Sequence, residues 1–432
     1  MRIGYAITVL LVLLLASTPA WCQPPVPAEA DAGAGDVGAA EPAQPQIVPQ
    51  ELPLTFDFED DADAQGWAPL VEGTTLTITH EPDEVRQGQG ALRFDYEPVE
   101  DYYLFQYGGL QVPGAKSLSF SVKASEKTPF LYGLGEGDGS AYDAFMQLPA
   151  NQWVDVEASL DDLQLRPGSD DENGELDSDQ ITTIVFFDLS NMPGEDGRAL
   201  GWKRDPQKLC IDNVVISDQE VPSIFQTENL ADGNRRIVVA DFESDNLHGL
   251  GVGGATLDHV AAGRGQALKI TYQVGPERWS GIVIGVEPLD LAGLATVKMR
   301  LKSAGKSSVN VVLEERGDKS QYERLVDVAG DGTWQSREVK LADFALSETS
   351  EDENEQIDLG EVRVLIVVVD TYNSEVDALG QGSVTVDDIE FICGPAVGPL
   401  GRELGPTRFG APMGGTAPVG PATAALRPRT GA

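Results

Sequence analysis

Short stretches of alternating polar and apolar residues run through the middle of the chain. Ser117–Lys123 alternates with a period of two, and so do Ala91–Tyr96 and Gln266–Tyr272. A period of two sends successive side chains to opposite faces of a strand, so each stretch predicts a strand with one solvated face. Val362–Val369 is instead a nearly continuous β-branched run, which predicts a strand buried on both faces. The pattern shows no convincing amphipathic helix.

These stretches belong to a series of features that occurs twice. The triplet Asp-Phe-Glu opens each copy, at residues 57–59 and 241–243. The features that follow in both copies are a Gly-x-Gly/Gln-Ala-Leu strand, a tryptophan (Trp153 or Trp334) before a Leu-x-Asp-Leu/Phe turn, an acidic loop (169–179 or 347–358) and a closing Ile/Val-Asp-Asn/Asp-Val/Ile strand. Each copy is far longer than a solenoid repeat, so the two copies predict two whole domains. We expect both tryptophans to lie in a core.

The repeat defines the domain organisation. The first module is predicted at 53–218 and the second at 236–393, with a polar connector at 219–235. Many short strands separated by Gly, Asn and Asp turns predict an antiparallel two-sheet sandwich, so the fold class is all-β with two tandem β-sandwich domains. Residues 23–52 are Pro/Ala-rich and residues 394–432 Gly/Pro/Ala-rich, which predicts a flexible linker and a disordered tail.

Residues 1–22 have the features of a secretory signal peptide. Arg2 supplies the charged start and Ile7–Ala16 an apolar segment too short to span a membrane comfortably. We therefore expect a secreted or cell-envelope protein. Cys22 suggests a lipid anchor, but Trp21 is not the small residue that lipidation requires before the cysteine, so no anchor is expected. A second long apolar run is absent from the sequence, and no transmembrane segment is predicted.

The composition excludes several classes of partner. The chain has 70 acidic and 30 basic residues and a formal net charge of −40. This charge would repel nucleic acids and anionic membranes, whereas it suits a soluble protein and the binding of divalent cations. The three cysteines, Cys22, Cys210 and Cys393, do not make a disulfide framework. We expect Cys210 to be a buried free thiol, while the sequence leaves the state of Cys393 open.

No catalytic motif is present in the sequence. It lacks Gly-x-Ser-x-Gly, His-Glu-x-x-His and a phosphate-binding glycine loop. A chain with so many carboxylates will contain acidic pairs by chance, so such pairs do not indicate a glycosidase. We expect a protein that is not an enzyme and acidic loops that are solvated; a polysaccharide lyase or hydrolase is the less favoured alternative.

The ordered set of repeated motifs resembles the jelly-roll carbohydrate-binding modules of the galactose-binding-like fold, over both modules. The resemblance implies a structural Ca²⁺ in each module that joins the first strand to the last. The ligands it implies are Glu59 and Asp212 in the first module and Glu243 and Asp387 in the second, with Asp57 and Asp241 as second choices. Carboxylates from distant strands that meet at one edge repel each other, and a hard cation with six to eight oxygen ligands offsets this repulsion. The alternative is that these carboxylates are solvated or pair with Arg or Lys.

Sugar recognition requires exposed aromatic faces flanked by polar groups. The candidate ligand-binding residues are Tyr102, Tyr103, Tyr107, Tyr142 and Trp202 in the first module and Trp279, Tyr322 and Tyr372 in the second. The alternative is that many of them are core residues. We expect a carbohydrate polymer or glycan as the partner, with two modules raising the avidity. The chief alternative function is a structural or adhesion scaffold that uses the same modules for protein interaction.

Overall fold

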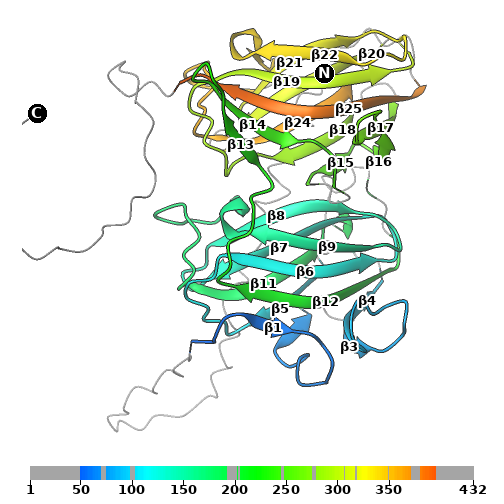
Figure 1. Cartoon of the computed structure of the whole chain (residues 1–432), viewed down its shortest axis with the longest axis vertical. Coiled ribbons are helices and arrows are strands. Elements are labelled where there is room, and N and C mark those ends of the chain that lie inside the picture. The colour runs from blue at the N-terminus through cyan, green and yellow to red at the C-terminus, as the bar shows by residue number, and fades with distance from the viewer. Residues whose placement is uncertain are drawn as a thin grey trace, which may run out of the picture.

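The computed structural model describes residues 49–69, 74–97, 103–191, 202, 205–244, 248–274, 279–305, 307–316, 319–348, 350–370 and 380–395. The predicted signal peptide, Cys22, nearly all of the predicted linker and all but the start of the predicted tail lie outside these residues. The regular secondary structure of the described part of the chain is β-strand apart from three 3-10 turns, and the strands are arranged as two stacked units (Figure 1). This confirms the all-β prediction. Among the described residues, no helix has the length and apolar character needed to cross a bilayer.

The first module is a sandwich of two antiparallel six-stranded sheets. Its strands are β1 (Leu54–Phe56), β2 (Trp67–Pro69), β3 (Thr75–Thr79), β4 (Ala91–Tyr96), β5 (Tyr103–Gly108), β6 (Ser117–Ala124), β7 (Thr128–Glu136), β8 (Ala141–Leu148), β9 (Trp153–Ser159), β10 (Gln164–Leu165), β11 (Ile181–Asp188) and β12 (Gln207–Ser217). Sheet A has the order β3-β4-β12-β6-β9, with β1 also paired to β12. Sheet B has the order β10-β8-β7-β11-β5-β2.

The second module repeats this topology. Its strands are β13 (Gln226–Asn229), β14 (Arg235–Ala240), β15 (Leu250–Val252), β16 (Thr256–Ala261), β17 (Gln266–Val274), β18 (Trp279–Gly285), β19 (Leu294–Ser303), β20 (Ser307–Glu315), β21 (Gln321–Val328), β22 (Gln335–Lys340), β23 (Ala345–Leu346), β24 (Val362–Asp370) and β25 (Gly380–Cys393). Sheet C contains β16, β17, β25, β19 and β22 in that order, with β14 on β25 and β13 beyond β14. Sheet D has the order β15-β18-β24-β20-β21-β23. The repeated sequence pattern therefore corresponds to a repeated arrangement of strands.

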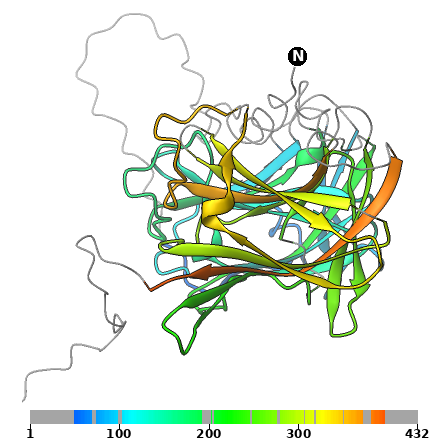
Figure 2. The ribbon, with the colours of Figure 1, turned by 90° about the horizontal axis from the view of Figure 1, so that it is seen from above.

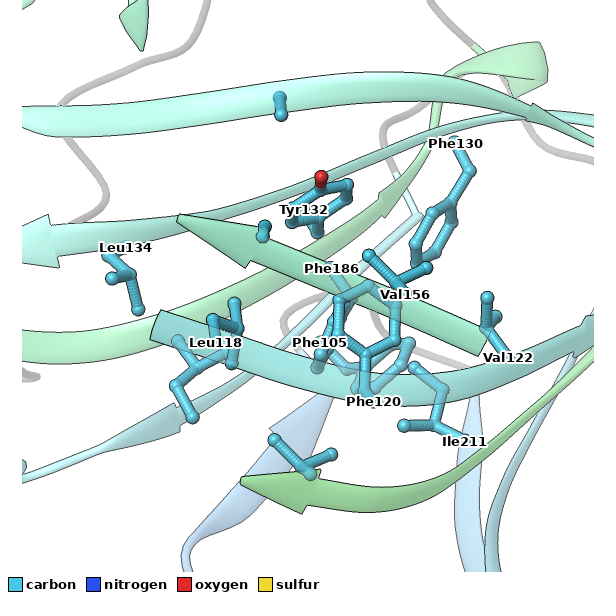
Figure 3. Close-up of a cluster of buried hydrophobic side chains, with 14 of the residues drawn as sticks. Phe105, Leu118, Phe120, Val122, Phe130, Tyr132, Leu134, Val156, Phe186 and Ile211 are labelled. Atoms are coloured by element: carbon cyan, nitrogen blue, oxygen red, sulfur yellow. The ribbon is translucent and has the colours of Figure 1, made fainter. Parts of the chain in front are cut away.

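Alternation along the strands fills the core of each sandwich. In β6, Leu118 and Phe120 point inward, and the ring of Phe120 lies 5.0 Å from that of Phe186 and 5.1 Å from that of Tyr132 (Figure 3). The first core is rich in such aromatic contacts, whereas that of the second module is mostly aliphatic. Three short 3-10 turns lie between strands: η1 (Leu160–Asp162), η2 (Leu189–Asn191) and η3 (Leu341–Asp343). Burial of this apolar surface is the main term that stabilises each sandwich.

Sheets B and D also pack against each other with their outer faces. In β24, Val364, Ile366 and Val368 point to the first module, while alternate residues of the strand point into the core of the second. The buried cluster between the modules, here called the inter-module cluster, consists of Leu131, Val185, Phe187, Leu189, Leu250, Val252, Trp279, Val283, Val312, Val364, Ile366 and Val368. Seen from above, the second module covers the first (Figure 2). The prediction that 362–369 is buried on both faces is therefore confirmed.

The connector between the modules is shorter than the sequence indicated. Residues 226–229 form β13 and pair with β14, so they already belong to sheet C. The preceding residues are held by the first module: Asp162, itself buried, accepts hydrogen bonds from Ser223 Oγ at 2.6 Å and from the amide of Ile224 at 2.9 Å. Burial raises the pKa of Asp162, while these two bonds lower it. The connector is thus packed rather than free.

Candidate functional site

Each Asp-Phe-Glu triplet adopts the same uncommon backbone conformation. Phe58 and Phe242 both have a φ of 56°, in the left-handed region that bulky residues rarely adopt. In each turn the aspartate Oδ1 accepts the amide of the glutamate two residues on, at 3.3 Å for Asp57 and 3.1 Å for Asp241. The turn buries the phenylalanine ring and sends the glutamate towards the loop that precedes β4 or β17. The two aspartates therefore act in the turn itself.

In the first module, Glu59 lies against the loop formed by residues 86–89. Its Oε1 accepts the amide of Gln89 at 2.8 Å. The carboxylate fits closely over Gly88, where an added Cβ would lie 1.7 Å from Oε1. Gly88 has a φ of 73°, so both the backbone conformation and the space at this position favour glycine. The glycine at position 88 thus gives the loop the space and the backbone conformation that the Glu59 carboxylate requires.

Asp212 approaches the same loop from the closing strand β12 and is fully buried. Its Oδ2 accepts the amides of Arg86 and Gln87, each at 2.9 Å, whereas Oδ1 has no hydrogen-bond partner in the described part of the chain. Burial raises the pKa of Asp212, the amides of Gln87, Arg86 and Asn213 lower it, and the negative charge of Glu59 raises it. A buried carboxylate oxygen without a partner, next to a second carboxylate, fits an oxygen-binding cation such as Ca²⁺.

The equivalent site of the second module has different partners. Arg300 Nη1 lies 3.0 Å from Asp387 Oδ2 and 2.9 Å from Asp388 Oδ2, and Asp387 Oδ1 accepts the amide of Asp388 at 3.0 Å. His259 Nδ1 lies 3.2 Å from the carbonyl oxygen of Phe242. Both oxygens of Asp387 thus have protein partners. This set does not fit a calcium ion as the first site does, and it follows the alternative in which the carboxylates pair with arginine.

Glu243 nevertheless keeps the contacts of Glu59. Its Oε2 accepts the amide of Gln266 at 3.2 Å, and an added Cβ at Gly265 would lie 1.8 Å from its Oε1. The backbone of the two sites is therefore shared, and the difference lies in the side chains around Asp387.

The described residues of the acidic loops are exposed or half-buried, as expected for solvated loops, and each loop is also tied to its sheet at its start. The phenol of Tyr142 donates to Asp171 Oδ2 at the start of one loop, and that of Tyr322 donates to Asp352 Oδ2 at the start of the other. Both tyrosine side chains are buried. Their assignment as sugar-stacking residues is wrong, because each ring lies inside its module and its hydroxyl anchors a loop.

A group of carboxylates gathers beside the first of these loops. Ligand oxygens of Glu136, Asp138 and Asp171 all lie within 4.8 Å of one another. Burial raises the pKa of Glu136, its bonds from Ser140 and the amide of Asp177 lower it, and the neighbouring carboxylates raise it. Hydrogen bonds within the protein thus already satisfy Glu136, and the group forms part of the loop anchor.

The three other predicted aromatics whose side chains the structure describes are buried or half-buried. Trp279 is buried in the inter-module cluster, and Trp202 packs against that cluster. Tyr107 is half-buried, with its ring 4.6 Å from that of Phe56 and 5.4 Å from that of Trp67. For Trp279 the prediction of an exposed stacking face is wrong, because the packing of sheet D on sheet B covers the indole. The side chain of Tyr103 and the whole of Tyr102 and Tyr372 lie outside the described residues.

Two tryptophans missed as ligand candidates lie on the open outer faces of sheets A and C. Trp153 and Trp334, expected in the cores, are half-buried and belong to neither core cluster. In β9, Val154 and Val156 point inward, so Trp153 points outward, opposite Lys123 of β6. Trp334 directly precedes β22, and the guanidinium carbon of Arg300 lies 4.6 Å from its ring centroid. The period-two alternation of the strand could have shown the outward direction.

Polar groups surround Trp153 on sheet A. Asp155 accepts two hydrogen bonds from the Arg86 guanidinium and one from Ser121 Oγ at 2.7 Å. Lys123 Nζ donates to the carbonyl of Asp83 at 2.6 Å. Beneath these groups Cys210 is a buried free thiol, as predicted, and burial raises its pKa to about 12. Cys393 is also a buried free thiol.

The chain is similar in structure to carbohydrate-binding modules. It resembles the N-terminal CBM22-1-CBM22-2 tandem domain of Xyn10C from Paenibacillus barcinonensis, with 16% identity and a TM-score of 0.26 over 82% of this chain and 99% of that one. It resembles the family 11 carbohydrate-binding module of Clostridium thermocellum in complex with a β-1,3-1,4-mixed-linked tetrasaccharide, with 15% identity and a TM-score of 0.29 over 39% and 98%. An exo-β-agarase matches with 19% identity and a TM-score of 0.30 over 39% of this chain and 24% of that one. No protein-family model and no curated protein matches the sequence.

Proposed function

We propose that the protein is a secreted, non-catalytic carbohydrate-binding protein that meets its glycan on the open outer faces of sheets A and C. The observation that carries this proposal is the tryptophan repeated on these faces, Trp153 and Trp334, each beside a lysine, Lys123 and Lys302. An indole face stacks on the apolar side of a sugar ring, and the charged and hydroxyl groups around it can bond the sugar hydroxyls. Two such faces on one chain raise the avidity for a repeating polymer.

The two faces are not equal. Arg300 lies over the ring of Trp334 at 4.6 Å and Lys302 Nζ is 5.8 Å from the same centroid, so cations already cover part of that indole. Among the described residues, no cation lies over the ring of Trp153, and its cross-strand neighbour Lys123 instead donates to the carbonyl of Asp83. We therefore assign the stronger sugar contact to Trp153 in the first module.

Calcium is the cofactor that we propose for the first module. Glu59 and Asp212 would hold it, and a cation there would tie the turn after β1 to the closing strand β12. The free Oδ1 of Asp212 supports this assignment. Removal of the ion with a chelator is expected to lower the melting temperature of the full chain, because two carboxylates would then face each other uncompensated. An unchanged melting curve would count against calcium.

The test of sugar binding is a pull-down of the full chain with insoluble polysaccharides, together with a glycan array. CBM22-1, part of the similar Xyn10C tandem domain, is itself named a xylan-binding domain, and the family 11 module is in complex with a β-1,3-1,4-mixed-linked tetrasaccharide, so xylan and mixed-linked β-glucan are the first probes. Trp153→Ala should weaken binding by about tenfold or more, in line with the loss of one aromatic stacking contact. Glu157→Ala, on the outer face of the same strand, is the control and should bind as the wild type does. Failure to bind any polymer would refute the proposal.

A second candidate function is a scaffold or adhesion protein. The observation that favours it is the inter-module cluster, which takes up Trp279 and the broad apolar faces of sheets B and D. Because this apolar packing fixes the two modules against each other, the chain is a rigid unit that suits the role of a spacer. Retrieval of a protein partner together with a negative glycan array would favour this second function.

A further inference from the structure

The two triplet sites are equivalent in position and different in chemistry. In the ladder between β6 and β12, Ser121 lies opposite Asp212. In the ladder between β19 and β25, Arg300 lies opposite Asp387. One strand position therefore carries a hydroxyl group in the first module and a guanidinium group in the second.

In the first module the nearby groups leave Asp212 uncompensated. Ser121 Oγ donates to Asp155, and the guanidinium of Arg86 also goes to Asp155, at 3.1 Å for Nε. Arg86 reaches Asp212 through its backbone amide and not through its guanidinium, and the amide of Gln87 also donates to Asp212. Among the described residues, no basic side chain pairs with Asp212, and its Oδ1 has no hydrogen-bond partner.

In the second module, Arg300 is the residue that contacts the carboxylates of the site. It bonds Asp387 and Asp388, and its guanidinium lies over the ring of Trp334. Asp388 follows Asp387 with a φ of 48°, just as Asn213 follows Asp212 with a φ of 51°. Equivalent backbone positions therefore carry an arginine and an aspartate in the second module and a serine and an asparagine in the first.

A second exchange occurs at the carbonyl of each triplet. His259 lies opposite Leu268 in its ladder, as Ile78 lies opposite Leu92. The Nδ1 of His259 lies 3.2 Å from the carbonyl oxygen of Phe242 and donates to it in the tautomer that carries the proton there. In the first module the apolar Ile78 stands in this place. The second site thus has two side-chain nitrogen partners that the first lacks at the same positions, His259 at the carbonyl of Phe242 and Arg300 at Asp387.

We propose that Arg300 replaces, in the second module, the cation that the first module binds at Asp212, so that the chain takes up one calcium ion rather than two. This inference rests on the calcium clamp proposed above. A guanidinium held between two carboxylates repels a divalent cation at the same oxygens and itself supplies charge-assisted bonds between neighbouring strands. The second module is tied by the protein alone and the first by the ion.

The number of tightly bound ions on the full chain tests this inference. We would strip the protein with a chelator and titrate it with CaCl₂ in a calorimeter at about 0.15 M salt, where weak binding to surface carboxylates is screened. The expected result is one ion per chain, lost in Asp212→Asn and kept in Asp387→Asn. Two ions in the wild type, with one lost in each variant, would overturn the exchange while leaving the clamp of the first module intact. The absence of any ion would refute the clamp and the exchange together.

A gain of binding gives an independent readout. Arg300→Ser restores the residue of the first module and should raise the count to two ions per chain. Lys298→Ser removes a positive charge from the same strand, where Lys298 pairs with Glu338 at 2.8 Å, and should leave the count at one. A folded Arg300→Ser protein that still binds one ion would overturn the exchange. If this variant does not fold, the wild-type count and Asp387→Asn decide the question.

Discussion

The indole of Trp202 donates from Nε1 to the backbone carbonyl of Gly251 at 2.7 Å, which joins the first module to the second by a direct hydrogen bond. A second bond runs from Lys127 Nζ to the carbonyl of Leu257 at 2.9 Å, and burial at this boundary lowers the pKa of Lys127. These polar contacts surround the inter-module cluster. Apolar packing supplies the attraction between two such surfaces, while directed bonds fix how they are aligned. We therefore expect the modules to unfold as one unit.

Trp202→Phe tests the hydrogen bond across the boundary. The change keeps most of the apolar surface and leaves the carbonyl of Gly251 without its donor, so we expect a loss of about 1–2 kcal/mol in the free energy of unfolding. Urea unfolding followed by circular dichroism measures it. The control is Trp153→Phe on the open face of sheet A, which should change stability by less than about 0.5 kcal/mol. Equal losses in the two variants would show that the bond to Gly251 contributes nothing particular.

Val368→Asp tests the packing of sheet D on sheet B. The substitution puts an unpaired carboxylate into the inter-module cluster, and water must enter to solvate it. We expect one calorimetric transition for the wild type and two for the variant, one for each module. Thr271→Asp makes a similar change on the outer face of sheet C and should leave one transition. One shifted transition in Val368→Asp would mean that the modules unfold together for another reason.

Asp162→Ala tests whether the hydrogen bonds of Asp162 keep the connector packed against the first module. The variant loses the bonds from Ser223 Oγ and the amide of Ile224 and leaves a partly buried amide without its acceptor, at a cost of about 1–2 kcal/mol. The connector should then be cleaved faster in limited proteolysis, with fragments that end near residues 219–225. Asp161→Ala, an exposed neighbour, is the matched control and should be cleaved at the wild-type rate. Equal cleavage rates would contradict a structural role for Asp162.

The strands and their repetition could be predicted from sequence because a period of two is a local property. Ser117–Lys123 and Val362–Val369 are strands as expected, and the second is buried on both faces. The sequence did not show what covers the outer face of that second strand. The sequence pattern of a β-branched strand is the same whether a helix, a sheet or another module covers it. The burial of Trp279 between the modules could therefore not be predicted.

The candidate site was predictable as far as the backbone repeats and no further. The equivalence of Glu59 and Glu243 follows from the triplets, and both lie against a glycine of the next loop. The pairing of Arg300 with Asp387 depends on strand register, because the two are distant in sequence and only the ladder places them opposite each other. The same holds for Tyr142 and Asp171, where a buried phenol anchors an acidic loop that composition alone marks as solvated.

The imidazole of His248, just ahead of β15, gives the protein a stability term that depends on pH. Burial lowers its pKa from 6.5 to about 4, so the folded protein holds the ring neutral at pH values where the unfolded chain protonates it. The unfolded state therefore binds more protons between pH 6.5 and 4, and the contribution to stability is complete above pH 6.5 and is lost as the pH falls towards 4.

The substitution His248→Gln should remove this pH-dependent contribution to stability. The ring is only half-buried and partly screened by water, so we expect the difference between variant and wild type to change by about 1–2 kcal/mol between pH 7 and pH 4.5. Urea unfolding of both proteins at several pH values measures it, and the protonation of carboxylates common to both cancels in the difference. Parallel stability curves over this range would show that His248 exchanges protons as freely in the folded protein as in the unfolded one.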